Sequence, residues 1–572
     1  MRARRPITRA LFIQSGLAVT LVAIGVAGTQ VAFGDDNDAH LRPGNLLVSR
    51  AVYDNNTKNI TAGVTLLPPN CVGAACAKAN ANGVYPGVFN NDQVDASFGI
   101  ASKIMLDQLT PSGSLISSIE VPNSAQRGVS ANADQMVTSF SSKSEMALNL
   151  STDRRFVTFM GYLAPVDAID VSNSNTPAVL DPTNPVPGQN YRVIAQLDWR
   201  GHFHFTKTNA YSGNNGRAAI LNTGSRPSVL YTAGNAGNGS NPQPNGIITG
   251  AGAQIVTASD EPLANQSPGD PTPVGSFSIT QLGDKADKVG KDTNFRGLTI
   301  FNNVIYTTKG SGSNGVNTVY FIDTTGINAA GQPLACPSGV GVPGSSTKLP
   351  ATPIAYNAAN LQTLGVVPYN MCILKGFAEG LAKSATNSSF PFGVWFANAN
   401  TLYVTDEGNG TASFNPATGT YAAAAAQTTA GLQKWVFNPS TGTWTMAYVL
   451  QAGLNLGAPY SVPDYPTGNN AVTGSPWAPA TDGLRNLTGR VNKDGTVSVW
   501  AITSTVSGSG DQGADPNKLV MITDKLDTTS LPAGENFTTV RTAHFAEVLR
   551  GVTFTPEAGE GDDQDHDHGN DH

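Results

Sequence analysis

A hairpin-like phrase recurs along this chain and constrains its fold more than any other feature. FRGLTIFNNVIYTTKG at 295–310 returns as FGVWFANANTLYVTDEG at 392–408, and weaker copies occupy 216–235 and 484–504. Each copy has an apolar segment, a short polar turn and a second segment rich in Val, Ile, Thr and Tyr. These are the residue preferences of β-hairpins. The sequence therefore predicts repeated antiparallel units of one kind.

Two further strand-like segments follow each hairpin. NTVYFIDTT at 317–325 follows the first copy, and GLQKWVFNPSTGTWTMAYVLQ at 431–451 follows the second. The predicted unit is thus a four-stranded antiparallel sheet. Such a sheet cannot bury both faces alone, so the units are expected to stack around an axis as the blades of a β-propeller. With 61 Gly, 36 Pro and only 13% charged residues, the composition also favours short strands and turns over long helices.

The spacing of the repeats gives the number of blades. Predicted first strands start near Arg217, Arg296, Phe392, Arg485 and Arg550, which is a step of about 83 residues. Residues 45–556 then hold about six blades, or seven if the long insert at 326–390 contains another. The fold class is therefore all-β, a propeller of four-stranded blades.

The two ends of the propeller region complement each other. LRGVTFTP at 549–556 matches a first strand and then stops, whereas NLLVSRAVY at 45–53 begins like a second strand. We expect the C-terminal strand to complete the N-terminal blade and so close the ring without an open edge. The alternative architecture, two β-sandwiches in tandem, does not predict a blade split between the termini.

This blade plan resembles secreted six-bladed propellers of the NHL, lactonase and lyase type. The resemblance covers about 510 residues, from 45 to 556, and rests on the repeat alone, since no catalytic motif of those families is matched. In a propeller, the loops that lead into each first strand and those that join second to third strands share one face. Candidate sites are therefore expected there, around the mouth of the central channel.

The segments outside the propeller region indicate export. Residues 1–34 have a basic start, an apolar stretch and small residues before Asp35, as in a signal peptide. An uncleaved membrane anchor is the alternative. Residues 35–44 form an acidic linker, and the Asp/His-rich tail at 557–572 is expected to be disordered. We predict a secreted or periplasmic monomer, with no transmembrane segment once the signal peptide is removed.

Charge and cysteine content add two expectations. Removing the four arginines of residues 1–34 leaves 30 basic and 41 acidic side chains, and so acidic a chain is not expected to bind nucleic acid. The even number of cysteines in an exported protein suggests two disulfides. The simplest of the three pairings joins Cys71 to Cys76 and Cys336 to Cys372.

Arginine recurs at one position of the blade plan. Arg217, Arg296, Arg485 and Arg550 each stand just before a predicted innermost strand, so ring symmetry would bring them around one opening. Guanidinium groups there could bind the carboxylate or phosphate of a small-molecule ligand. The alternative is structural: Asp292, Asp482 and Glu547 lie three or four residues upstream, and Arg/acid pairs would tie neighbouring blades together.

Carboxylates form a first candidate metal site. Asp406 and Glu407 follow a second strand in YVTDEGNG, and their oxygens suit a hard cation such as calcium. Asp54, Asp167 and Asp511 occupy comparable loops in other blades. Plain solvation of the loops is the alternative.

Histidines form two further candidate metal sites. His202 and His204 alternate with Phe203 and Phe205, so in a strand both imidazoles would share one face and suit a transition metal, with Asp198 or His544 as further ligands. Ordinary surface histidines are the alternative. In the tail, His566, His568 and His572 alternate with Asp and could chelate zinc, copper or nickel loosely, or the tail could merely increase solubility.

No catalytic constellation is legible in this sequence. We therefore predict an exported, extracytoplasmic protein that binds a small molecule or a surface partner at the channel mouth, with a structural divalent cation as an option. The alternative is a metal-dependent, lactonase-like hydrolase or lyase whose site lies at the same mouth, with Asp406, Glu407 or the His202/His204 pair holding the ion. A quinoprotein-like redox role is a third hypothesis, with no cofactor motif to favour it.

Overall fold

The computed structural model describes residues 40–559, apart from a series of internal segments. The segments left out are 68–76, 81–98, 131–133, 143–144, 170, 172–190, 209, 212–214, 236–251, 260–275, 278–293, 312–314, 327, 330–333, 352–369, 383–388 and 510–511. The predictions for the signal peptide, Cys71, Cys76, Asp292, Asp511, His566, His568 and His572 lie outside the described residues.

Six antiparallel sheets account for most of the described chain, and their strand order is that of propeller blades. From the channel outward, blades 1 to 3 comprise, in blade 1, β30 (Glu547–Phe554), β1 (Leu46–Val52), β4 (Ala101–Leu109) and β5 (Leu115–Glu120); in blade 2, β7 (Asn149–Leu150), β8 (Phe156–Tyr162), β9 (Arg192–Asp198) and β10 (Phe203–Thr208); and in blade 3, β11 (Gly216–Asn222), β12 (Val229–Gly234), β13 (Ala253–Thr257) and β14 (Ser276–Phe277).

The second half of the ring repeats this order. Blades 4 to 6 comprise, in blade 4, β15 (Leu298–Phe301), β16 (Val304–Lys309), β17 (Thr318–Ile322) and β19 (Met371–Leu374), with β18 (Val340–Gly341) beyond it; in blade 5, β20 (Pro391–Asn398), β21 (Thr401–Asp406), β24 (Gly431–Asn438) and β25 (Thr443–Leu450); and in blade 6, β26 (Ala480–Val491), β27 (Thr496–Val506), β28 (Lys518–Lys525) and β29 (Thr538–Thr542).

Short elements decorate the blades. They are β2 (Leu66–Leu67) with β3 (Ala77–Lys78), β6 (Thr138–Ser139), β22 (Phe414–Asn415) with β23 (Thr420–Tyr421), and the four-residue helix α2 (Ala422–Ala425). Helix is thus almost absent from the described residues, as the composition predicts.

The six innermost strands form a closed cycle of contacts. Each of β30, β7, β11, β15, β20 and β26 contacts the next, and β26 contacts β30 again. The second strands β12, β16 and β21 are buried along their whole length, because a neighbouring blade covers each face of the sheet. The hydrophobic core therefore lies between blades rather than in one central mass, and the predicted six-bladed propeller is confirmed.

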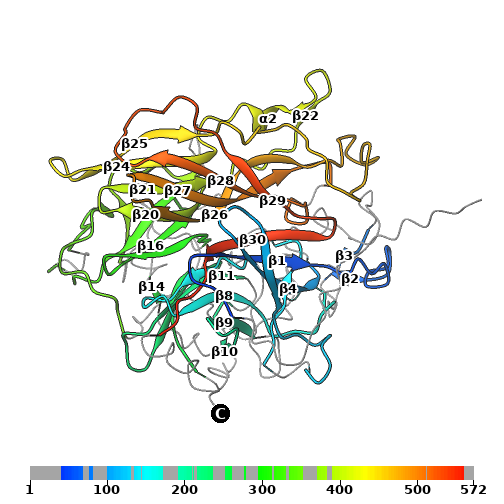
Figure 1. The fold of residues 1–572 in the computed structure, drawn as a ribbon, viewed down its shortest axis with the longest axis horizontal. Helices are drawn as coiled ribbons and strands as arrows, with labels where there is room; N and C mark the ends of the chain where they lie inside the picture. The colour runs from blue at the N-terminus through cyan, green and yellow to red at the C-terminus, as the bar shows by residue number, and fades with distance from the viewer. Residues whose placement is uncertain are drawn as a thin grey trace, which may run out of the picture. The chain divides into compact units, whose positions relative to one another are not determined.

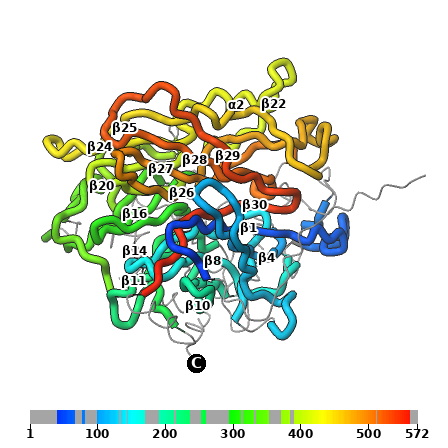
Figure 2. Tube along the Cα trace, in the orientation of Figure 1, coloured from blue at the N-terminus to red at the C-terminus, as the bar shows by residue number. Residues whose placement is uncertain are grey.

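The last strand of the chain closes the ring as the split repeat predicts. β30 pairs with β1 in antiparallel register from Leu46 opposite Phe554 to Val52 opposite Glu547. Figures 1 and 2 show the C-terminal strand, in red, lying beside the N-terminal strand, in blue. Arg50 in β1 reinforces this junction, since its guanidinium pairs with Glu547 of β30 and, at 2.9 Å, with Asp107 of β4.

A repeated hydroxyl bridge fixes the innermost strands to one another. In blade 5 the N–H of Gly393 donates to Thr405 Oγ1 at 2.7 Å, and that hydroxyl donates to the carbonyl of Arg485 in blade 6. Gly297 and Thr308 make the same bridge from blade 4 to Phe392 of blade 5. Gly551 and Ser49 make it from blade 1 to Met146 of blade 2, at 2.8 and 2.9 Å.

Glycine is required at this bridge because the neighbouring backbone comes so close. A Cβ on Gly297 would lie 2.1 Å from the carbonyl oxygen of Phe392, and one on Gly551 would lie 2.4 Å from that of Met146. Gly297, after Arg296, and Gly551, after Arg550, therefore permit close packing of adjacent innermost strands, which the sequence repeat did not explain.

Replacing Thr405 by Val is expected to destabilise the fold by about 1–3 kcal/mol. The two side chains have nearly the same shape, but Val leaves the Gly393 N–H and the Arg485 carbonyl buried without this partner. Urea unfolding of the variant measures the loss. Thr418→Val, in an exposed turn, is the matched control and is expected to change stability by less than about 0.5 kcal/mol; equal losses in both variants would contradict this role for the bridge.

The segment 326–390 is only partly an insert. β19 supplies the fourth strand of blade 4, so this segment completes that blade, and no seventh blade appears among its described residues. Cys372 in β19 forms the predicted disulfide with Cys336, across 36 residues of chain. The bridge anchors the segment to blade 4.

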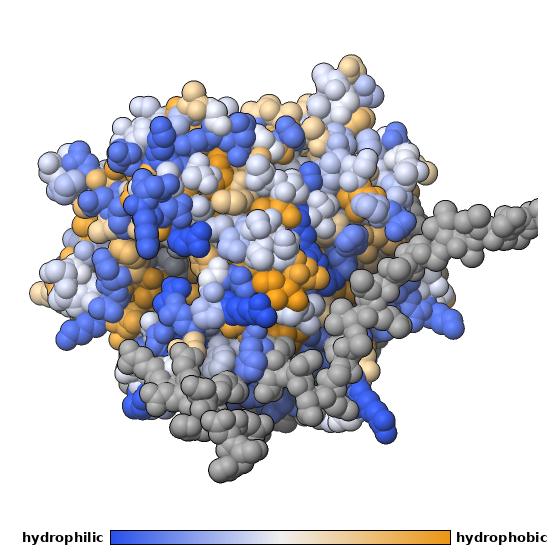
Figure 3. Space-filling view, in the orientation of Figure 1, coloured by the Kyte–Doolittle hydropathy of each residue, from blue (hydrophilic) through white to orange (hydrophobic). Residues whose placement is uncertain are grey.

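Hydrophobic side chains appear only in small, separate patches on the face shown in Figure 3. Within the part of the chain that the structure describes, no helix is long and apolar enough to span a membrane.

Candidate functional site

Each blade contributes one residue, on its innermost strand or two to three residues before it, to a layer across the channel, which we call the mouth layer. Each of its residues directly precedes the small or polar residue of the interblade contact. From blade 1 to blade 6 the mouth layer consists of Arg550, Met146, Arg217, Arg296, Phe392 and Arg485. The four recurring arginines thus lie at equivalent positions of four blades, all of them buried.

Glu407 joins two of these arginines. Its carboxylate lies 3.1 Å from Arg485 Nε and 3.7 Å from a terminal nitrogen of Arg296. Both guanidinium groups also lie over the ring of Phe392, at 5.6 Å for Arg296 and 6.0 Å for Arg485. Blades 4, 5 and 6 therefore converge on one cluster of two cations, one anion and one aromatic ring.

Arg217 extends this cluster toward blade 2. One of its terminal nitrogens donates to the Asn294 side chain and, at 2.7 Å, to the carbonyl of Phe295. Arg217 lies within electrostatic reach of Arg296, Glu407 and Glu145. Glu145, fully buried, accepts hydrogen bonds from Thr138, the Ser139 N–H and Tyr162.

Arg550 completes the layer with backbone partners. A terminal nitrogen donates to the carbonyls of Phe140 and, at 3.0 Å, Gly513. The upstream acids that the sequence suggested as partners are engaged elsewhere. Glu547 pairs with Arg50, and Asp482 accepts hydrogen bonds from the Gly410 N–H at 2.8 Å and from Gln427 at 2.6 Å. The carboxylate in ion-pair contact with Arg485 is that of Glu407, and Asp482 lies only within electrostatic reach of Arg485.

Positive charge exceeds negative charge in the mouth layer and its immediate acids. Four arginines stand against Glu145, Glu407 and Asp482 among the described residues, and Asp482 lies within electrostatic reach of Arg485. Burial, and then the charge of Arg296, hold the pKa of Arg217 well below its usual value. Burial also lowers the pKa of Arg296; Glu407 opposes this effect and Arg485 adds to it. The mouth therefore holds guanidinium charge that its own carboxylates do not fully neutralise.

The predicted carboxylate pair is occupied by protein donors. Asp406 is fully buried and accepts hydrogen bonds from Ser389, the N–H groups of Phe390 and Gly408, and Gln433. Burial raises the pKa of Asp406. Because Glu407 binds two arginines, a cation placed here would compete with existing partners at both carboxylates.

Asp482 is the carboxyl group most changed by its place beside the mouth. Burial raises the pKa of Asp482 to about 7, although its hydrogen bonds with Gly410 and Gln427 favour the ionised form, and the nearby charge of Glu407 adds to the increase. This carboxyl group can therefore carry a proton near neutral pH.

Asp482→Asn is expected to flatten the dependence of stability on pH between about 4 and 7. A folded-state pKa above the unfolded value means that the folded state binds more protons, so the free energy of unfolding falls as pH rises through this window. Relative to the Asn variant, the native protein should lose about 1 kcal/mol or more over that range. Thermal melts at half-unit pH steps measure this, and parallel profiles for the two proteins would refute it.

The remaining metal candidates do not come together into one site. β10 begins at Phe203, so His202 lies in the preceding turn rather than in the strand, with Nδ1 3.3 Å from Asp198. His204 bonds to Gln196 at 2.8 Å instead. Asp54 does lie beside Asp167, and burial followed by the charge of Asp54 raises the pKa of Asp167. No group of three His, Cys, Asp or Glu side chains placed to hold a metal occurs among the described residues.

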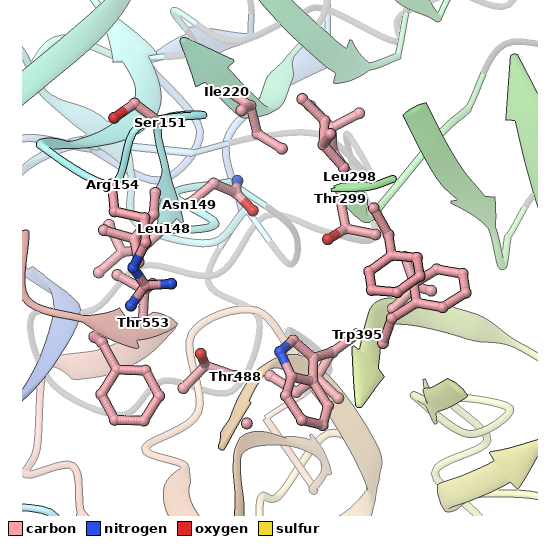
Figure 4. Close-up of a pocket in the computed structure, with 18 of the residues that line it drawn as sticks. Leu148, Asn149, Ser151, Arg154, Ile220, Leu298, Thr299, Trp395, Thr488 and Thr553 are labelled. Carbon is pink, nitrogen blue, oxygen red and sulfur yellow. The ribbon is translucent and has the colours of Figure 1, made fainter. Parts of the chain in front are cut away.

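A chamber occupies the channel beyond the mouth layer. It has a volume of about 850 Å³, and the innermost strands of all six blades line it. Figure 4 shows its wall, including Asn149, Thr299, Trp395 and Thr488, from four different blades. Leu349, from the segment 326–390, also lines the chamber. The repeat does carry a signal for this cavity, because the residues three positions after each mouth residue are equivalent in all six blades, as the arginines are in four.

Comparison with known proteins adds no family. No family model matches the chain, and no curated protein matches it. Among solved structures, a mutant of the Synechocystis apocarotenoid oxygenase is similar over 80% of this chain, at 9% identity and a TM-score of 0.20, and this chain spans only 59% of that one. The extracellular domains 1–2 of Drosophila Semaphorin 1a are similar over 77% of this chain and 85% of theirs, at 10% identity and a TM-score of 0.22. Such low scores carry no argument about function, so the fold rests on this chain's own strand pairing.

Proposed function

We propose that this chain is an exported propeller protein that binds a small anionic ligand, a carboxylate or a phosphate ester, at the mouth of its channel. The observation that carries the proposal is the excess of buried guanidinium charge in the mouth layer, above all at Arg217. Its side chain is buried, its charge is disfavoured by burial and by Arg296, and its Nε has no hydrogen-bond partner among the described residues. An anion close to this guanidinium would supply the missing charge.

The arrangement of the arginines also supports an anionic ligand. Arg296 and Arg485 both lie over Phe392 and share one carboxylate. A guanidinium held in this way is already ordered, so less conformational entropy is lost when a ligand binds. Glu407 then acts as an internal counter-ion that an incoming carboxylate or phosphate would supplement.

The extracytoplasmic location is part of the proposal. The Cys336–Cys372 disulfide is compatible with an oxidising compartment, and the first 34 residues have the sequence pattern of a signal peptide.

Binding of sulfate, phosphate and citrate tests the proposed function. The native protein is expected to gain thermal stability with these anions beyond what chloride produces at equal ionic strength, because a ligand of the folded state stabilises it by mass action. Arg217→Gln and Arg485→Gln are each expected to weaken binding at least about tenfold in titration calorimetry, the loss typical of a charged hydrogen bond.

Arg541→Gln is the matched control for this experiment. Arg541, in β29 of blade 6, pairs at 3.0 Å with Asp107, in β4 of blade 1, and neither residue belongs to the mouth layer. The control removes the half-buried guanidinium partner of Asp107 and lowers stability, but it should leave anion affinity unchanged. Equal shifts with chloride, or undiminished affinity in the Arg217 and Arg485 variants, would rule out a mouth site.

A second candidate is a hydrolase or lyase that works at the same mouth. It is favoured by Asp482, whose pKa of about 7 suits a group that donates a proton near neutral pH. A metal-dependent form of this activity requires an ion near Asp406 and Glu407, or at the His202/His204 pair. Metal analysis of protein that ends at residue 559 discriminates between the two functions: a stoichiometric ion that survives dialysis favours the enzyme, and its loss favours the binding protein.

A further inference from the structure

A second layer of side chains lines the chamber, three residues beyond the mouth layer on each innermost strand. We call it the chamber layer. Each blade contributes one residue, and five of the six can form hydrogen bonds. From blade 1 to blade 6 the chamber layer consists of Thr553, Asn149, Ile220, Thr299, Trp395 and Thr488.

The polar groups of this layer point toward the middle of the cavity. Figure 4 shows the amide of Asn149, the hydroxyls of Thr299 and Thr488 and the indole nitrogen of Trp395 around one open space. The hydroxyls of Thr299 and Thr488 and the indole nitrogen of Trp395 come from three different blades, so a ligand in the chamber would meet polar groups on several sides.

Apolar side chains, and charged side chains that already have partners, also line the chamber. Leu148, Leu298, Val394 and Leu487 lie one position before the chamber layer on their strands and line the cavity. The charged lining residues are already engaged. Arg154 pairs with Glu557 at 2.6 Å, and Arg490 lies over the rings of Trp500 and Phe554 at 5.7 and 6.0 Å.

We propose that this chamber is a second binding site, for an uncharged, hydroxyl-rich ligand, namely a saccharide of one or two rings. A sugar presents hydroxyls on its rim, which suit amide and hydroxyl partners, and C–H groups on its faces, which suit Leu side chains and the Trp395 ring. The volume of about 850 Å³ lies within the range of small-molecule pockets. The chamber layer carries no charge, in contrast to the mouth layer, and Arg154 and Arg490 on the wall are engaged with Glu557 and with aromatic rings, so an uncharged ligand is favoured here.

Calorimetric titration with glucose, galactose, mannose, maltose, cellobiose and lactose tests the chamber. At least one of these sugars is expected to bind with a dissociation constant of millimolar or below. The double variant Asn149→Ala/Thr488→Val should weaken that binding at least tenfold. Thr443→Val, which removes a hydroxyl from the outer strand β25, is the matched control and should leave sugar binding unchanged. Melting curves of every variant verify that it is folded.

Three results would overturn the chamber site: no sugar of the panel binds, binding survives in the double variant, or the uncharged apolar dye Nile red occupies the chamber and no sugar displaces it. The outcome is separable from that of the proposed function. The double variant should retain its affinity for sulfate, whereas Arg485→Gln should lose sulfate and retain the sugar. Loss of sugar binding only in the Arg485 variant would place the sugar at the mouth and contradict a separate chamber site.

Discussion

A chain that ends at Ala543 is expected to lose its cooperative unfolding transition. This truncation removes β30, which is the innermost strand of blade 1, pairs with β1 along its length and contacts β26 of blade 6. Without β30, β1 becomes an exposed edge strand and the ring opens at the channel. Arg50, which pairs with the buried Asp107, also loses its ion pair with Glu547. Circular dichroism melts and gel filtration should show an aggregating or broadly unfolding protein.

A chain that ends at Ala558 is the control for this truncation. It lacks the Asp/His-rich tail but keeps β30 and the ion pair between Arg154 and Glu557. Its melting temperature should match that of the full chain. If the protein ending at Ala543 melted as sharply and at the same temperature, closure by β30 would not be needed for stability.

Asp524→Ala is expected to destabilise the protein by about 3–5 kcal/mol, because it leaves a buried lysine without its counter-ion. Lys434 Nζ lies 3.1 Å from Asp524, and neither side chain is exposed to solvent. Asp524 also accepts hydrogen bonds from Tyr403 and, at 2.6 Å, from Tyr448. This network joins blade 5 to blade 6, so urea unfolding should report its loss as a lower midpoint.

Lys434→Met separates the charge from the other contacts of the network. Met keeps most of the side-chain volume, and the double variant with Asp524→Ala removes both charges of the buried pair, leaving Glu535 as the carboxyl group nearby. We expect the double variant to be more stable than the sum of the two single losses implies, by about 1–3 kcal/mol. Additive losses would show that Lys434 and Asp524 are not coupled.

Much of the fold could be predicted because the same hairpin pattern recurs along the sequence. The hairpin copies at 295–310 and 392–408 became β15/β16 and β20/β21, and the split first blade was visible in the similarity of 549–556 to other first strands. The fourth strand of blade 4 was missed. β19 is short and lies within a long irregular segment, and it is placed by pairing with β17 and by the disulfide at Cys372, neither of which leaves a periodic pattern in sequence.

The positions of the four arginines in the candidate site could be predicted from the sequence, but the residues that they contact could not. The repeat predicts that the four arginines are equivalent, because residues at the same position of each blade lie at the same depth along the channel of a symmetric ring. The pairing with Glu407 did not follow, because that carboxylate comes from the loop after β21 and crosses to two other blades. Local sequence proximity favoured Asp482 and Glu547 instead, and both are engaged elsewhere.

Anomalous diffraction from crystals soaked in sodium selenate tests the central claim most directly. Selenate has the charge and shape of sulfate, and its selenium can be located without ambiguity. We expect an anomalous peak with oxygens within hydrogen-bonding distance of Arg217, Arg296 or Arg485 in the mouth layer, absent in Arg217→Gln crystals. Peaks confined to the outer surface, with the mouth filled by protein side chains alone, would contradict it.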